Sequence, residues 1–396
     1  MQAIRLKTEH LFDPMGVDFT APRLYWNCDG GKKQTAYQIV AADDGGSILW
    51  DSGRVESAAM CVKWGGAPVP PKTKVFWQVR LWDEENAAGD WSKASFETGI
   101  GAWSAKWITG DYKVNKKARY PVDCFRKVFH SAAVKKARLY ITACGLYEAR
   151  LNGQRVGDFV RAPGITDYRK RVQYQTYDVT QLLQEGENTL TVQLADGWYR
   201  GSCGAWGLKN QYGTETKLLA QLELTHADGS VQTIVTDESW EWSNDGPIRF
   251  ADNKDGEIID AQKTPSYSGK AKVTSHPVTP SASNNVPVTE HERMKPVCIT
   301  TPSGKTVLDF GQNIAGYAEF TVTAHAGQTL KLRFGELLDA EGEFTQKNIQ
   351  CSNKNITTPL QQVVYTCKEG ENHYKTTFAI FGFQYILVET EVPFQP

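Results

Sequence analysis

The sequence predicts an all-β protein made of three consecutive β-sandwich domains, and three observations lead to this prediction. Apolar residues recur with the two-residue period of strands, whereas the 3.6-residue period of helices is nearly absent. The candidate strands are short and are separated by turn residues such as Asn-Gly, Asp-Gly and Pro. Aromatic residues make up 11% of the 396 residues, and large flat side chains favour sheets.

Charge and composition exclude several classes of protein. The chain has 44 Lys and Arg against 45 Asp and Glu, a balance that argues against nucleic acid held by bulk electrostatics. No run of about 18 apolar residues is present, and the first residues do not resemble a signal peptide. The eight cysteines are scattered without a C-x-x-C pair, which favours free thiols. We therefore expect a cytoplasmic protein that binds neither nucleic acid nor a membrane.

The first domain is expected over residues 1–100. Its clearest strand covers 74–83, where alternate residues are apolar and face one side of a sheet. A polar turn over 84–90 precedes a second strand over 91–98. The order W-x-V-R-x-x-D, G-x-W-S and F-x-T resembles the last two strands of a fibronectin type III sandwich.

The second domain is expected over residues 101–270. A hairpin is predicted around Asn152-Gly153, because this pair suits the type I′ turn of two-residue hairpins. Further strands are expected over 174–183 and 186–194. The series L-N-G-x-x-V-G, Y-D-V-T-x-L-L and G-x-N-x-L-x-V resembles jelly rolls of the galactose-binding type.

The rest of the chain is expected to hold a connector over residues 271–296 and a third sandwich over 297–396. The connector is rich in Pro, Ser, Thr and Asn, which favour exposed irregular structure. The third block again shows short alternating segments. Its predicted strands cover 305–310, 318–323, 329–334, 362–366, 375–379 and 383–388.

No motif in the sequence carries a catalytic residue. There is no G-x-S-x-G elbow, and the seven His residues show no metal-ligand spacing. Hydrolysis of a glycosidic bond requires two carboxylates across a sugar cleft. Forty-five acidic residues leave such a pair possible, but no spacing singles one out.

Sugar binding is the chemistry that remains, and the glycine-rich loop over residues 195–207 is its richest segment. Aromatic rings stack on the apolar faces of sugars, whereas acids and arginines bind hydroxyls. Main-chain carbonyls of such a loop can also ligate Ca²⁺. The alternative is that the aromatics pack against a neighbouring domain. The candidates for sugar contact in this loop are Asp196, Trp198, Tyr199, Arg200 and Trp206.

Two other loops carry candidate residues. Asp167 and Tyr168, in the loop over 163–169, are further candidates for sugar contact, with a structural role as the alternative. The segment 252–257 could form a second polar rim, but structural Asx-turn chemistry is the favoured interpretation of its composition.

Motifs in all three blocks together resemble bacterial α-L-rhamnosidases of glycoside hydrolase family 78. The match covers essentially the whole chain, in family order, and implies a jelly-roll domain followed by a concanavalin-like sandwich. The segments that carry it are 10–26, 34–39 and 49–57 in the first block, 151–157, 162–172, 174–180 and 196–201 in the second, and 308–316, 334–339 and 381–385 in the third.

In that family the catalytic acids lie on a downstream (α/α)₆ toroid, and this sequence shows no helical hairpins. The resemblance therefore implies a non-catalytic β-sandwich portion that is inactive by itself. It would bind L-rhamnose or a rhamnoside and support a catalytic domain from another chain. Some members bind L-rhamnose with Ca²⁺ in the jelly roll, where Ile165 here replaces the common Trp after Pro-Gly. Two alternatives stay open, namely a scaffold without sugar affinity and a complete hydrolase with a cleft between sandwiches.

Overall fold

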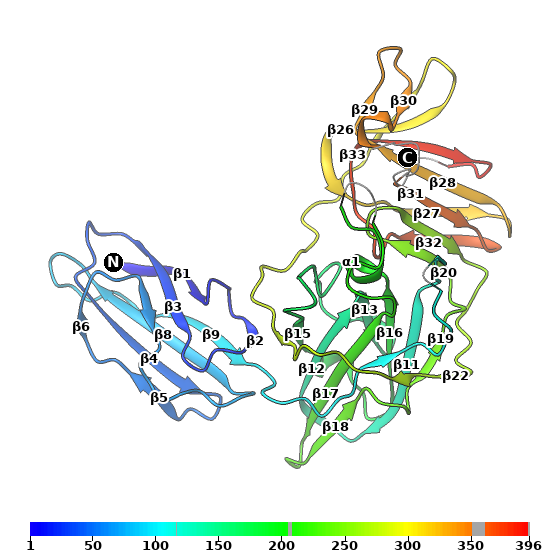
Figure 1. Ribbon diagram of the computed structural model, residues 1–396. Coiled ribbons are helices and arrows are strands. Elements are labelled where there is room, and N and C mark those ends of the chain that lie inside the picture. Colours follow the sequence, from blue (N-terminus) through cyan, green and yellow to red (C-terminus); the bar gives the residue numbers. More distant parts are fainter. Residues whose placement is uncertain (116, 205–207, 351–360, 395–396) are drawn as a thin grey trace. The chain divides into compact units, whose positions relative to one another are not determined.

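The computed structural model describes all residues except 116, 205–207, 351–360 and 395–396 (Figure 1). Its regular secondary structure, among the described residues, is almost entirely strand, which confirms the predicted all-β class. The helical segments among them are the four-residue helix α1 (Gly197–Arg200) and the 3₁₀ turns η1 (Thr180–Leu182) and η2 (Lys347–Ile349). Within these ranges, no helix is long and apolar enough to cross a bilayer.

The chain divides into two compact units. The first unit contains Met1–Ser104, Gln173–Tyr177 and Pro280–Val286. The second unit contains Ala105–Val172, Asp178–Thr279 and Pro287–Pro396. The jelly-roll and the third sandwich therefore lie together in the second unit.

The first unit is a sandwich of two sheets around a core rich in tryptophan. Trp26 from one sheet and Trp77 from the other are both buried in this core. The Trp77 indole N–H donates to Thr8 Oγ1 at 3.2 Å. One sheet has the order β1 (Gln2–Thr8), β3 (Arg23–Asp29) and β7 (Cys61–Lys63). The other has the order β2 (Met15–Val17), β9 (Ser92–Thr98), β8 (Lys74–Trp82), β4 (Ala36–Asp43) and β5 (Ile48–Asp51), with β6 (Val55–Glu56) also on β4.

The alternation predicted for the strand at 74–83 is present in β8. Val75, Trp77, Val79 and Leu81 are buried, whereas Phe76 is exposed on the opposite face. This unit also holds residues 173–177 of β15 (Gln173–Asp178), which pair in parallel with β24 (Ser281–Ala282).

The jelly-roll part of the second unit also consists of two sheets. Asn152 and Gly153 both have positive φ, as a type I′ turn requires, and they join β13 to β14 as predicted. One sheet has the order β14 (Gln154–Arg155), β13 (Leu146–Leu151), β16 (Gly186–Ala195), β11 (Asp123–Ser131), β19 (Glu241–Ser243) and β22 (Gly269–Lys270). The other includes β23 (Lys272–Val273), β10 (Ile108–Thr109), β17 (Lys217–His226) and β12 (Val134–Cys144), with β18 (Val231–Val235) on β17.

The third sandwich is built on a seven-stranded sheet with aromatic packing at its centre. The rings of Phe334 and Phe381 stack with centroids 4.0 Å apart. The sheet has the order β20 (Ile248–Asp252), β21 (Gly256–Asp260), β31 (Gln362–Thr366), β28 (Thr329–Gly335), β33 (Phe381–Thr390), β26 (Thr306–Gly316) and β25 (Val297–Thr300). Two smaller pairs accompany it, β27 (Glu319–Ala324) with β32 (Gly370–Lys375) and β29 (Leu337–Leu338) with β30 (Phe344–Thr345).

The first two strands of this sheet come from the range 101–270 that the sequence assigned to the jelly roll. β21 pairs in parallel with β31, and Gly256 lies opposite Gln362. Gly256 has φ +113°, and a Cβ there would lie 1.7 Å from the Gln362 carbonyl oxygen. Glycine is therefore required where the jelly-roll segment enters the third sandwich.

Candidate functional site

Helix α1 begins two residues after the end of β16 and lies within the predicted sugar-binding loop over residues 195–207. Gly197 adopts φ +52°, and a Cβ there would lie 3.0 Å from the Gly145 and Leu146 backbone, so the chain can turn here only at glycine. The turn places Arg200 one helical turn after Asp196, and Arg200 Nη2 lies 2.6 Å from Asp196 Oδ1. Both side chains are buried.

Arg200 extends this ion pair into a buried polar network. Its Nη1 donates to the Tyr112 hydroxyl, and the Tyr112 hydroxyl lies 3.4 Å from Asp123 Oδ2. Asp123 also accepts hydrogen bonds from Thr216 Oγ1 and Trp242 Nε1, both at 2.9 Å. Burial raises the pKa values of Asp196 and Asp123, and the charge of Arg200 opposes that rise.

A second acidic pair lies beside the chain that follows α1. Arg119 bridges Asp252, at 3.3 Å, and Asp255. The Ser202 N–H donates to Asp252 Oδ2 at 2.8 Å. Asp252 Oδ1 accepts the main-chain N–H groups of Lys254 and Asp255, which is the Asx-turn arrangement considered for this segment.

Four of the predicted sugar-binding side chains lie in the interior of the domain. Asp196 and Arg200 pair with each other, while Tyr168 and Tyr199 are 1% and 4% exposed. The two tyrosine rings meet edge to face at 5.2 Å, and the Tyr168 hydroxyl donates to the Gly164 carbonyl oxygen. In this conformation all four pack against or pair with protein groups, as in the structural alternative.

The remaining candidates retain some accessible surface or lie outside the described residues. Trp198 is half-buried, packs against a cluster that includes Phe378, and lies beneath the guanidinium of Arg161 at 5.7 Å. Asp167 is partly exposed and accepts a hydrogen bond from Arg169 at 2.8 Å. Ile165 is 52% exposed. Trp206 lies outside the described residues, so its predicted role is not addressed by the structure.

The carboxylates near α1 do not offer a ready set of metal ligands. Asp196, Asp252 and Asp255 are engaged by arginines or main-chain N–H groups. Among the described residues, no group of three or more His, Cys, Asp or Glu is arranged around a metal position. The predicted Ca²⁺ site relied on main-chain carbonyls of the loop over 195–207, part of which is not described, and it stays a prediction.

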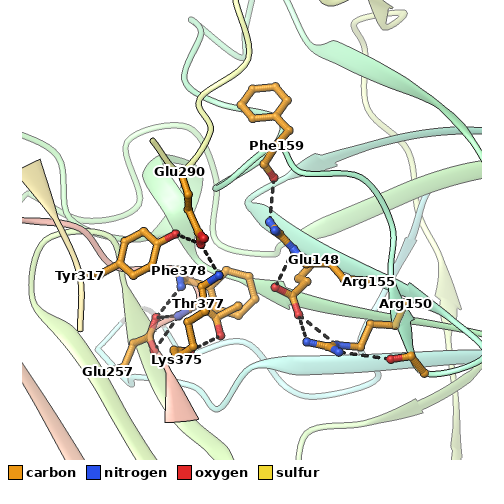
Figure 2. Close-up of polar contacts among 11 residues, drawn as sticks. Glu148, Arg150, Arg155, Phe159, Glu257, Glu290, Tyr317, Lys375, Thr377 and Phe378 are labelled. Carbon is orange, nitrogen blue, oxygen red and sulfur yellow. Dashed lines mark hydrogen bonds and ion pairs between the residues drawn. The ribbon is translucent and has the colours of Figure 1, made fainter. Parts of the chain in front are cut away.

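Sequence reasoning missed a polar junction between the jelly roll and the third sandwich (Figure 2). Glu257 is buried in β21 and accepts the N–H groups of Thr377, Phe378 and Ala379 together with the Tyr374 hydroxyl. Its position in an acidic, glycine-containing segment gave no sign of this role.

Further ion pairs extend the same junction (Figure 2). Glu290 pairs with Lys375 and accepts a hydrogen bond from the Tyr317 hydroxyl. On the jelly-roll side, Glu148 pairs with Arg150 at 2.8 Å and with Arg155 at 3.3 Å. The carboxylates in this group therefore all have basic or hydroxyl partners.

Sequence models of three domain families match the chain in order. Residues 3–102 match the Rha78A-like N-terminal immunoglobulin domain, and residues 132–301 match the α-L-rhamnosidase N-terminal domain. Residues 299–394 match the concanavalin-like domain of bacterial α-L-rhamnosidases.

Individual relatives show the same similarity. An α-L-rhamnosidase of Formosa agariphila is 33% identical over 96% of this chain and 44% of its own length. The crystal structure of an Aspergillus terreus α-L-rhamnosidase matches 98% of this chain and 47% of its own chain, with 31% identity and a TM-score of 0.90. A Streptomyces avermitilis α-L-rhamnosidase solved with L-rhamnose matches 100% of this chain and 56% of its own, with 26% identity and a TM-score of 0.89.

Three β-sandwich domains in this order define the β-domain portion of a bacterial glycoside hydrolase. The chain belongs to the bacterial α-L-rhamnosidase family, as its resemblance implied. It spans about half the length of the curated relatives that it matches.

Proposed function

We propose that this chain is a sugar-binding, non-catalytic portion of an α-L-rhamnosidase-type protein. In this proposal it binds an L-rhamnose-containing glycan or glycoside and supports a separately supplied catalytic domain. The observation that carries the proposal is the match of 98% of the chain to an α-L-rhamnosidase structure at a TM-score of 0.90. The relative solved with L-rhamnose, which aligns over the full chain, supports the choice of sugar.

Three buried acids of the jelly roll and the third sandwich support a non-catalytic role. A general acid in glycoside hydrolysis must reach the glycosidic oxygen. Asp123, Asp252 and Glu257 are each at most 1% exposed and accept hydrogen bonds from protein groups. Such carboxyl groups stabilise the fold and are not placed to meet a sugar.

A scaffold without sugar affinity is the second candidate function. The burial of Tyr168, Tyr199, Asp196 and Arg200 favours it, because these side chains satisfy one another or the main chain. Trp198 then serves to pack α1 against the cluster that contains Phe378.

Calorimetric titration with L-rhamnose, with and without Ca²⁺, separates the two functions. The sugar-binding proposal predicts saturable binding that weakens in Trp198→Ala, because stacking contributes about 0.5–1.5 kcal/mol beyond area burial. Trp91→Ala is the matched control, since Trp91 also lies beneath an arginine, Arg80 at 4.8 Å, in the first unit. Absence of binding under both conditions would support the scaffold instead.

A further inference from the structure

Arg161 occupies an unusual position on the loop between β14 and β15. Its backbone adopts φ +58°, a left-handed conformation that is uncommon for a residue with a side chain. Its guanidinium lies over the Trp198 ring, 5.7 Å from the centroid. The side chain is half-buried, so a basic group meets an aromatic surface at the edge of the predicted sugar-binding loop.

Among the described residues, the Arg161 side chain has no hydrogen-bonded or ion-paired partner. Its Nε is buried and unsatisfied. Neighbouring arginines differ in this respect, since Arg155 pairs with Glu148 and Arg200 with Asp196. A half-buried charge without a counter-ion is costly, and the cost is removed when an anion binds.

The groups nearest to Arg161 do not supply that anion. Tyr317 lies near enough to act on the pKa of Arg161, but burial together with the hydrogen bond to Glu290 raises the pKa of this phenol, which stays neutral. The Glu290 carboxylate is itself occupied by Lys375 and by the Tyr317 hydroxyl (Figure 2). Burial lowers the pKa of Arg161, as expected for a cation that lacks a partner.

Cation–π contact with Trp198 does not satisfy the unpaired Nε of Arg161. A ring face attracts the charge, but it does not accept the in-plane N–H of Nε. The planar guanidinium fork instead matches the oxygens of a carboxylate or a sulfate, which it binds through two parallel hydrogen bonds.

We propose that Arg161, supported on the Trp198 ring, binds a carboxylate or sulfate carried by the glycan. The site would then prefer a rhamnose-containing glycan that carries an acidic group over a neutral rhamnoside. This inference rests on the sugar-binding function proposed above and adds the class of ligand to it.

The test compares acidic and neutral sugars by calorimetric titration of the whole chain. The probes are methyl β-D-glucuronide, glucose 6-sulfate and methyl α-L-rhamnoside. We expect at least one acidic probe to bind about ten-fold more tightly than the neutral rhamnoside, because hydrogen bonds between ionised groups are the stronger ones. The two acidic probes distinguish a carboxylate ligand from a sulfate ligand.

Substitution then assigns any preference to Arg161. Arg161→Gln should abolish the preference for the acidic probe over methyl α-L-rhamnoside, since the ionic hydrogen bonds are lost. Arg126→Gln is the matched control, because Arg126 lies over the Tyr267 ring at 4.2 Å but is paired with Glu241 at 2.6 Å. The control should keep the full preference.

A second measurement does not require the Arg161→Gln variant to fold. The affinity of the unmodified chain for the acidic probe should fall as NaCl is added, whereas its affinity for the rhamnoside should not. Equal affinity for acidic and neutral probes, or an unchanged preference in Arg161→Gln, overturns the inference about Arg161 alone. Absence of binding to every probe overturns the sugar-binding proposal as well.

Discussion

Asp196 and Arg200 lie one helical turn apart and form an ion pair inside the jelly-roll domain. Arg200 Nε and Nη2 are 2.7 and 2.6 Å from the same oxygen, Asp196 Oδ1. The guanidinium also binds Tyr112 and lies over the Tyr120 ring at 4.6 Å. The pair thus fixes α1, and with it Trp198, against the body of the domain.

Removal of Arg200 should therefore destabilise the domain strongly. Arg200→Met leaves the buried Asp196 carboxylate without its partner, which we expect to lower the free energy of unfolding by about 3–5 kcal/mol. Urea unfolding measures the change. Arg249→Met is the matched control, because Arg249 also pairs with an acid four residues away, the exposed Asp245. It should cost at most about 1 kcal/mol. Similar losses in both variants would contradict the buried pair.

Glu257 should stabilise the junction between the jelly roll and the third sandwich. In Glu257→Gln one carboxylate oxygen becomes an NH₂ group that faces main-chain donors, so we expect a loss of roughly 3 kcal/mol. Hydrogen exchange should also accelerate at the amides of Thr377, Phe378 and Ala379, which donate to this carboxylate.

The control for Glu257 is an exposed glutamate with a main-chain partner. Glu369 accepts the Ala326 N–H at 3.0 Å at the surface, and Glu369→Gln should cost no more than about 1 kcal/mol. Unchanged exchange at residues 377–379 in Glu257→Gln would show that the junction does not depend on this carboxylate.

We expect protonation of His276 to lower the free energy of unfolding in weak acid. Burial lowers the pKa of His276 from 6.5, and the charge of Lys217 acts in the same direction. The unfolded chain therefore takes up the proton first as the pH falls, so the contribution of His276 is present above pH 6.5 and is lost below it.

Urea unfolding at about pH 7.5 and about pH 5.5 measures this dependence. The unmodified chain should lose more stability between the two values than His276→Gln does. His291→Gln, at an exposed histidine, serves as the control and should retain the pH dependence of the unmodified chain. Equal losses in the unmodified chain and His276→Gln would contradict the assignment.

Local pattern was enough to predict the strands and the hairpin. The alternation in β8 and the Asn152-Gly153 turn depend on neighbouring residues, which a sequence displays directly. The pairing of β21 with β31 joins Gly256 to Gln362, and no local period encodes a contact at that separation. The segment 248–260 was therefore placed with the jelly roll that precedes it in sequence.

One predicted strand lies at the wrong residues for a physical reason. A strand was expected over 375–379, but β32 covers Gly370–Lys375 and shares only Lys375 with that range. The N–H groups of residues 377–379 donate to Glu257 rather than to a neighbouring strand, so the extended pairing cannot continue. The apolar pattern of residues 375–379 gives no information about their contact with Glu257, which is distant in the sequence.

The candidate site was predicted less completely than the fold. A glycine-rich loop with aromatic residues looks the same in sequence whether its rings stack on a sugar or pack inside the domain. Tyr168 and Tyr199 pack on one another, whereas Trp198 keeps some accessible surface. Arg161 attracted no attention because its lack of a counter-ion is a property of the fold and not of its neighbours in the chain.

The most direct test of the account is turnover of an aryl α-L-rhamnoside by this chain. The described residues form β-sandwiches whose most buried acids are engaged by protein groups, and we propose that catalysis requires a domain supplied separately. The account predicts no release of the aryl group above the buffer rate. Measurable hydrolysis that disappears when a single Asp or Glu of this chain is replaced would contradict it.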